Sequence, residues 1–158
     1  MKFTHLIEIN DPRNPLLEPL SHEQLWRGLV LRAEAPGLFM PHLDECTIFE
    51  RNEEVMLREL RYGSVVIRDQ VTLVPPQQVR YRVPAQHDIV ASRLDMTIEE
   101  PQPGLLYVRF TYDEEDAGVE GEAEAMYNDF RRSAYEAADI DTISVIRELA
   151  ANERFGPD

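Results

Sequence analysis

The first ten residues alternate between apolar and polar side chains. Phe3, His5, Ile7 and Ile9 share one parity, whereas most positions of the other parity are polar. This period of two predicts a strand over residues 2–10 with one buried face. Because His5 lies on the apolar parity, its imidazole is expected to face the interior.

A helical pattern follows a proline-rich connection. Ser21 and Gln24 match a capping box, in which each side chain bonds to a backbone amide at the start of a helix. Apolar residues at helical spacing predict a helix from about residue 23 to residue 33 or 35. A Pro-Gly pair ends this helix, and a second short helix is expected over residues 37–40.

Six short segments rich in apolar and β-branched residues come next. Turns containing proline, glycine or asparagine separate them, and these turns are too short for the crossover helices that parallel strands require. The segments therefore predict an antiparallel meander. The predicted strands are 47–51, 55–62, 64–74, 79–83, 89–99 and 105–113.

A long helical pattern closes the chain and runs to about residue 155. Apolar and small residues recur in it at helical spacing. The face expected to pack against the rest of the fold carries Tyr127, Phe130, Ala134, Ala138, Val145 and Leu149. Asp139 and Asp141 interrupt the apolar surface and are expected at solvated positions beside that face.

The chain is strongly acidic. Its 158 residues include 16 Lys and Arg against 30 Asp and Glu, which gives a net charge of −14 at pH 7. This charge repels a phosphate backbone and an anionic membrane surface, so neither a nucleic acid nor a membrane is expected as a partner. Seven of the acidic residues lie between Asp113 and Glu124 without a Lys or Arg. The length favours one domain over residues 1–158.

The single cysteine, Cys46, excludes an intramolecular disulfide and a zinc site built from several cysteines. No stretch approaches the roughly 18 apolar residues of a membrane span, and the first residues lack the apolar region of a signal peptide. The sequence therefore predicts a cytoplasmic protein. The histidines lack metal-ligand spacing and no glycine-rich phosphate loop is present, so no metal and no cofactor are expected.

The predicted order of elements is a strand, two short helices, six antiparallel strands and a long helix. In this order the sequence resembles the START-like, or SRPBCC, superfamily, which includes birch-pollen-allergen-like proteins, lipid-transfer domains and polyketide cyclases. It is most similar to the AtaL-like family, through the segments KFTHLIEIN, SHEQLWRGLVLRAEAPGLFMP and RRSAYEAADIDTISVIREL. The resemblance implies an α+β helix-grip fold, in which a curved seven-stranded antiparallel sheet wraps around the C-terminal helix and leaves a cavity for an apolar molecule.

Strand parity identifies the side chains expected in such a cavity. Asp69 lies on the apolar parity of its strand and needs a donor such as Arg58, His5 or a tyrosine, because a lone buried carboxylate is costly. The parity of residues 55–62 is ambiguous, so Arg58, Glu59 and Arg61 compete for the inward face. Alternatively, each polar group is satisfied by a neighbour or lies at a strand end in water. The residues expected to bind a ligand are Tyr81, Ser92, Leu94, Met96, Phe110, Tyr112, Tyr127, Phe130 and Ala134.

Three functions fit these patterns. The first is the binding of a small hydrophobic or aromatic molecule in the cavity. The second is an enzyme that resembles the polyketide cyclases or aromatases, with His5, Asp69 and Tyr112 as the groups that transfer protons. The third is a protein-interaction module, which the charged outer parity of the strands disfavours. The sequence fixes neither the ligand nor a reaction, and it leaves a homodimer open.

Overall fold

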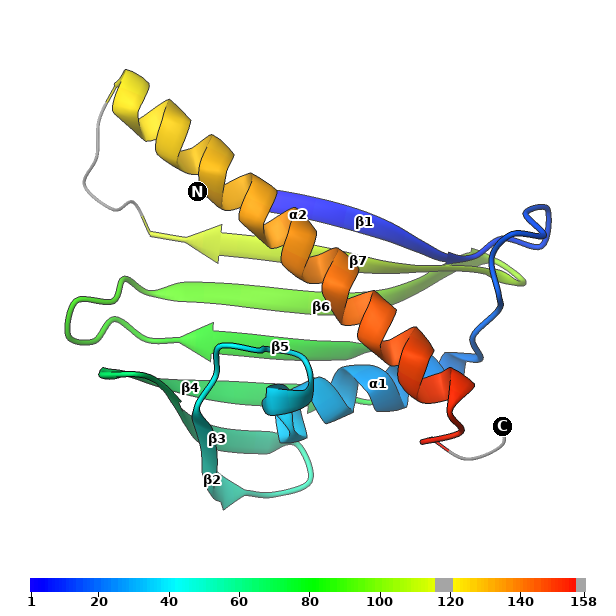
Figure 1. Ribbon diagram of the computed structural model, residues 1–158, viewed down its shortest axis with the longest axis horizontal. Coiled ribbons are helices and arrows are strands. Elements are labelled where there is room, and N and C mark those ends of the chain that lie inside the picture. The colour runs from blue at the N-terminus through cyan, green and yellow to red at the C-terminus, as the bar shows by residue number, and fades with distance from the viewer. Residues whose placement is uncertain (116–120, 156–158) are drawn as a thin grey trace.

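The computed structural model describes residues 1–115 and 121–155. Seven strands form one sheet in the order β1-β7-β6-β5-β4-β3-β2, and each neighbouring pair is antiparallel (Figure 1). The predicted antiparallel sheet and long C-terminal helix are confirmed. The elements are β1 (Lys2–Asn10), α1 (His22–Glu34), a 3₁₀ turn η1 (Pro36–Leu38), β2 (Glu45–Arg51), β3 (Val55–Tyr62), β4 (Val65–Val74), β5 (Gln78–Val83), β6 (Ser92–Gln102), β7 (Leu105–Glu114) and α2 (Glu122–Ala151).

The capping box at the start of α1 is confirmed. The Ser21 hydroxyl accepts a hydrogen bond from the Gln24 amide, and the Gln24 side chain accepts one from the Ser21 amide, both at 2.9 Å. The second predicted short helix is instead the single 3₁₀ turn η1. Residues 116–120 of the acidic segment lie outside the described residues. The last helix, α2, begins at Glu122 and ends at Ala151, a few residues before the predicted end near residue 155.

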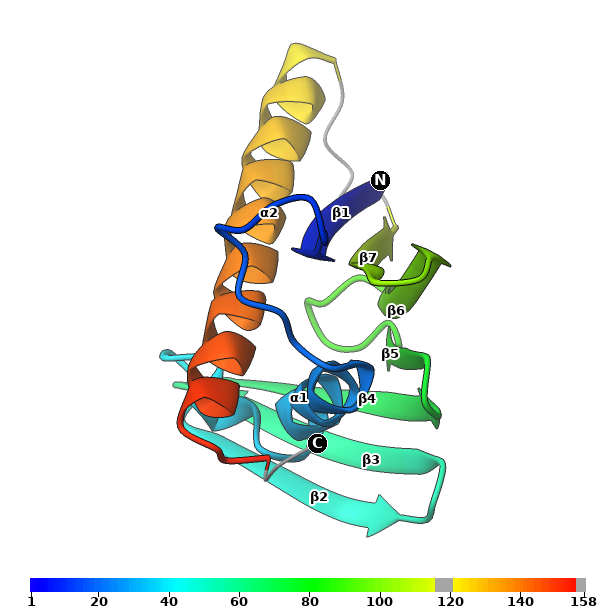
Figure 2. The same ribbon diagram turned by 90° about the vertical axis from the view of Figure 1, so that its right-hand side faces the viewer.

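The sheet bends between β4 and β5, so that β2, β3 and β4 turn beneath α1 while the other four strands lie beside α2 (Figure 2). The core fills the resulting angle, where Leu25, Phe110 and Ile146 have no exposed surface. The two helices meet at Gly28, because a Cβ atom at this position would lie 2.6 Å from Cγ2 of Ile146. Any larger residue would therefore separate α1 from α2 or force Ile146 to move.

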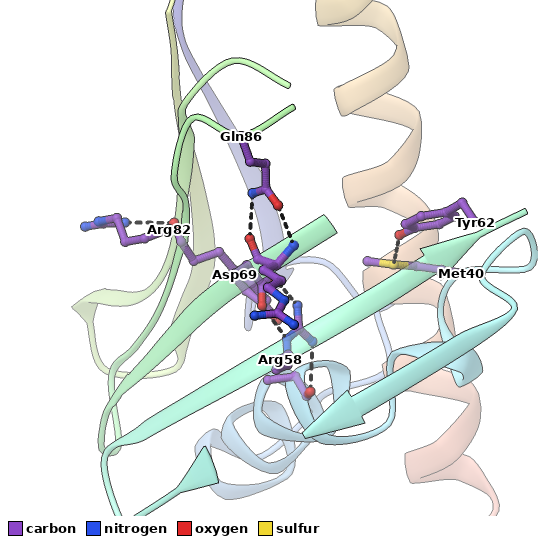
Figure 3. Close-up of polar contacts among 9 residues, drawn as sticks. Met40, Arg58, Tyr62, Asp69, Arg82 and Gln86 are labelled. Atoms are coloured by element: carbon purple, nitrogen blue, oxygen red, sulfur yellow. Dashed lines mark hydrogen bonds and ion pairs between the residues drawn. The ribbon is translucent and has the colours of Figure 1, made fainter. Parts of the chain in front are cut away.

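A glutamine side chain continues the sheet where β4 and β5 part. The β4–β5 ladder ends at the pair Gln70 and Arg82. Beyond it, the side-chain amide of Gln86 donates to the Arg68 carbonyl and accepts from the Arg68 amide, both at 2.9 Å (Figure 3). Residues 84–91 therefore form a loop that lies against β4, and β6 begins at Ser92 rather than at the predicted residue 89.

The ambiguous parity of β3 is settled by burial. Met56, Arg58 and Leu60 are buried, whereas Arg61 is exposed and Glu59 is only half-buried. Arg58 is therefore the inward charged residue of this strand.

The predicted packing face of α2 is wrong in its first half, although Val145 and Leu149 in its second half do pack against the core. Phe130 is 74% exposed, Tyr127 is 43% exposed, and Ala134 is also exposed. The first turns of α2 extend beyond the edge of the sheet formed by β1 (Figure 2), so apolar side chains there have no sheet to pack against. The buried face lies further along the helix and consists of Asp139, Thr142, Ile143 and Ile146.

Candidate functional site

A cavity of about 190 Å³ lies between the inner face of the sheet, α1 and α2. Five of the candidate residues line it, namely Asp69, Tyr81, Ser92, Leu94 and Tyr112. Its wall combines apolar side chains with a few charged groups, which is the usual composition of a small-molecule site. The complete lining is Arg32, Met40, Arg58, Leu60, Tyr62, Ile67, Asp69, Tyr81, Val83, Ser92, Arg93, Leu94, Tyr112, Glu114 and Tyr135.

The remaining candidate residues lie elsewhere. Met96 and Phe110 face inward but are completely buried in the core, where they pair in the β6–β7 register. Tyr127, Phe130 and Ala134 are absent from the lining, because the face of α2 that carries them is turned away from the sheet. These three residues therefore do not form part of the wall of this cavity.

A larger hollow of about 550 Å³ opens on the opposite face of the sheet. Leu57, Gln70, Arg82, Arg93 and Asp113 line it and follow one another across β3 to β7 in the strand register. This hollow is open and lies mainly on the face away from α2, although Asp69, Val83, Ser92 and Arg93 line both it and the smaller cavity. We place the candidate site in the smaller cavity, since buried polar side chains converge there.

Arg58 and Asp69 form a buried ion pair at the floor of the cavity. Nε and Nη2 of Arg58 donate to the two carboxylate oxygens of Asp69, at 2.9 and 2.6 Å, and Nη1 donates to the Ala33 carbonyl of α1 at 2.9 Å (Figure 3). The side chains are 2% and 5% exposed. Arg58 is thus the donor that Asp69 was predicted to need, and the pair joins β3, β4 and α1.

A second buried carboxylate, Asp139 of α2, is 1% exposed and contacts the cavity wall from behind, through Tyr112. Its Oδ1 accepts a short hydrogen bond from the Tyr112 hydroxyl, and its Oδ2 lies 3.1 Å from Nδ1 of His5. The Tyr112 ring stacks on Tyr135 with 4.0 Å between the ring centroids. Two of the three candidate proton-transfer residues, His5 and Tyr112, therefore both contact the carboxylate of Asp139. Asp69, the other candidate, does not take part in this cluster.

Burial changes the acidity of this cluster. It raises the pKa of Asp139 to about 6, although the hydrogen bonds from Tyr112 and His5 oppose the shift. Burial also raises the pKa of Tyr112, and the neighbouring Asp139 charge adds to the effect. Asp139 can therefore exchange a proton near neutral pH, whereas the Tyr112 hydroxyl stays protonated.

The sequence prediction placed Asp139 in solvent, and this was wrong. The signal was present in the helical spacing, because Asp139 lies three, four and seven residues before Thr142, Ile143 and Ile146, the buried face of α2. An acidic residue on the stripe that packs on a sheet indicates a buried partner on that sheet. The partner is Tyr112, which parity correctly turned inward.

No group of His, Cys, Asp and Glu within residues 1–115 and 121–155 is arranged to hold a metal ion. In the same two ranges, neither helix has the length and hydropathy needed to cross a membrane.

Comparison with known proteins agrees with this architecture. The family model of acetylaranotin biosynthesis cluster protein L, AtaL, matches residues 7–153. No curated protein matches the chain. Among solved structures, the Zhui aromatase/cyclase from Streptomyces sp. R1128 is similar with a TM-score of 0.63 and 12% identity, over 97% of this chain and 94% of that one.

Two further structures share the fold. A START superfamily protein from Mycobacterium smegmatis gives a TM-score of 0.64 with 15% identity, over 94% of this chain and 98% of that one. The di-domain aromatase/cyclase StfQ from the steffimycin biosynthetic pathway gives 0.69 with 13% identity, over 99% of this chain and 52% of that one. The chain therefore spans about half of StfQ. Identities this low show the fold alone, but the family match covers most of the sequence: the chain belongs to the AtaL family and has the helix-grip fold of the START-like proteins.

Proposed function

We propose that this protein binds a small, largely apolar molecule of about the size of one aromatic ring between the sheet and α2. The observation that carries the proposal is the cavity of about 190 Å³, in which buried polar groups converge within an apolar wall. Leu60, Ile67 and Leu94 supply apolar surface, and the stacked rings of Tyr112 and Tyr135 supply a flat aromatic one.

The size of the cavity limits the affinity. An aromatic ring buries roughly 150–250 Å², and at about 25 cal/mol per Å² this contributes roughly 4–6 kcal/mol before the costs of association. Apolar contact alone therefore gives weak binding, and polar contacts are needed for a tighter complex.

Filling the cavity is expected to abolish binding. We expect fluorobenzene, followed by ¹⁹F NMR, to bind the natural chain and to bind Leu94→Trp at least tenfold more weakly, because the indole occupies the free volume. Leu6→Trp is the matched control, since Leu6 is 43% exposed on β1 and does not line the cavity. Equal binding to Leu94→Trp and the natural chain would contradict the proposed location.

A second candidate function is enzymatic, and the Asp139 cluster favours it. Tyr112 lines the cavity, and its hydroxyl is hydrogen-bonded to a carboxyl group whose pKa is raised to about 6 by burial. Such a pair can pass a proton to or from a bound substrate. Two of the structures with this fold are aromatase/cyclases, so a polyketide-like or aromatic substrate is the class to test.

Turnover of such a substrate is expected to fall 10²- to 10⁴-fold in Tyr112→Phe, the usual contribution of a positioned acid or base. Binding of fluorobenzene to the same variant should be unchanged. Tyr107→Phe is the control, because Tyr107 lies on the opposite parity of β7. Full turnover in Tyr112→Phe would rule out this enzymatic role and leave binding alone.

A further inference from the structure

Arg32 of α1 is a buried cation that lines the cavity without an ionic partner. Its side chain has one hydrogen bond, from Nε to the Thr142 hydroxyl at 3.3 Å, and the residue is 8% exposed. A guanidinium group has five N–H donors, so most of its donors are not used by the protein. Since burying an unpaired charge is costly, this arrangement needs an explanation.

The other charged residues of the cavity wall are all paired. Arg58 binds Asp69, Arg93 lies 3.5 Å from Asp113, and Glu114 contacts Arg131 of α2. Arg32 is the exception among the lining residues of the described chain. The last turn of α1, where Arg32 lies, offers only the partial negative charge of a helix end.

Asp139 is one candidate counter-charge for Arg32 and does not fill this role directly. Arg32 is one of the groups that lower the pKa of Asp139, so the two side chains interact electrostatically. Nevertheless, both Asp139 oxygens bond to other groups, Tyr112 and His5, and no ion pair joins Asp139 to Arg32 in the described residues.

A second polar group beside Arg32 also lacks a partner. The hydroxyl of Tyr81 is buried and makes no hydrogen bond within the described part of the chain. The guanidinium carbon of Arg32 lies 5.1 Å from the centroid of the Tyr81 ring, and that of Arg58 lies 5.3 Å from it. A buried hydroxyl without a partner is uncommon in folded proteins, and here it lies next to the unpaired cation on the same cavity wall.

We infer that the ligand of this cavity is a small apolar carboxylic acid, whose carboxylate is bound by Arg32 and Tyr81 while its ring lies against Leu94 and Ile67. The inference rests on the proposed binding function and adds the chemical class of the ligand. A carboxylate has two oxygens, which match the planar donor fork of an arginine, and it also accepts from a tyrosine hydroxyl. A bound carboxylate would therefore give a partner to both the Arg32 guanidinium and the Tyr81 hydroxyl.

The test compares two probes of equal shape, 4-fluorobenzoate and 4-fluorobenzamide, by ¹⁹F NMR at pH 7.5. The natural chain is expected to bind the carboxylate at least tenfold more tightly than the amide, as charged hydrogen bonds are about twice as strong as neutral ones. Arg32→Met should bind both probes with similar affinity. Tyr81→Phe should bind 4-fluorobenzoate several-fold more weakly than the natural chain does.

The control is Arg68→Met, because Arg68 lies on the opposite face of the sheet and lines the larger hollow. It should keep the full preference for the carboxylate. If the preference disappears in Arg68→Met and persists in Arg32→Met, the acid binds the outer face and the inference is overturned. An unchanged affinity of Tyr81→Phe for 4-fluorobenzoate would overturn the role of Tyr81.

The outcomes separate this inference from the proposed function. Equal binding of both probes to the natural chain would overturn the acid preference and leave the binding function intact, whereas binding of neither probe would count against both. Thermal unfolding gives an independent measurement, since Arg32→Met removes an unpaired charge and should melt no lower than the natural chain. A fall in melting temperature as large as that expected for a broken buried ion pair would show that Arg32 has an ionic partner within the protein and would overturn the inference.

Discussion

Replacing Arg58 by methionine is expected to lower the free energy of unfolding by about 3–5 kcal/mol, the usual cost of removing one member of a buried ion pair. The carboxylate of Asp69 would remain in the interior without its two donors, and the Ala33 carbonyl would lose its partner as well. Urea denaturation at pH 7 measures the change.

Two further variants test the cause of this loss. Arg61→Met, on the same strand, removes an exposed arginine and should change the free energy of unfolding by less than about 1 kcal/mol, because exposed ion pairs contribute little. The double variant Arg58→Met, Asp69→Leu should recover most of the stability, since no charge is then left unpaired. A double variant as unstable as Arg58→Met would show that the lost packing, rather than the unpaired carboxylate, causes the effect.

The second large effect is a dependence of stability on pH through Asp139. The pKa of this carboxyl group is raised from 3.8 to about 6 by burial, so the folded protein holds a proton that the unfolded chain releases between about pH 4 and pH 6. The stability gained from the protonated form is complete below pH 4 and is lost as the pH rises through 6. A shift of about two pKa units corresponds to about 3 kcal/mol as an upper value.

Asp139→Asn removes this titration. The difference in unfolding free energy between Asp139→Asn and the natural chain should therefore move in favour of the variant as the pH rises from 4 to 7. Asp141→Asn is the matched control, because Asp141 is an exposed residue of the same helix, and its difference should stay constant over this range. The same constant difference for Asp139→Asn would contradict the raised pKa.

Strand alternation predicted the fold well. A half-buried strand places every second side chain on one face, so His5, Asp69, Tyr81 and Tyr112 were correctly turned inward before any tertiary contact was known. The alternation shows which face of the sheet a side chain lies on, but it does not show where along the strand the cavity lies. It therefore could not separate Tyr81, which lines the cavity, from Phe110, which is buried in the core.

The helix was harder to predict from sequence. The predicted apolar stripe of α2 runs from Tyr127 to Leu149, and only tertiary packing decides which part of it is buried. Its aromatic residues, Tyr127 and Phe130, are exposed because they lie where the helix extends past the sheet. The buried face of α2 carries Asp139, whose burial depends on Tyr112, a residue far away in sequence. The unpaired state of Arg32 likewise follows only from three-dimensional distances.

The contact between Gly28 and Ile146 also fixes the height of the cavity. Ile146 lies near the C-terminal end of a helix of 30 residues, and Tyr135, which forms part of the cavity roof, is about 16 Å away along the helix axis at about 1.5 Å per residue. A larger side chain at position 28 would push the C-terminal part of α2 away from α1, and a straight helix would then tilt along its whole length. The absence of a side chain at Gly28 thus sets how closely α2 approaches the rest of the fold. The space available to a ligand therefore depends on a residue that does not line the cavity.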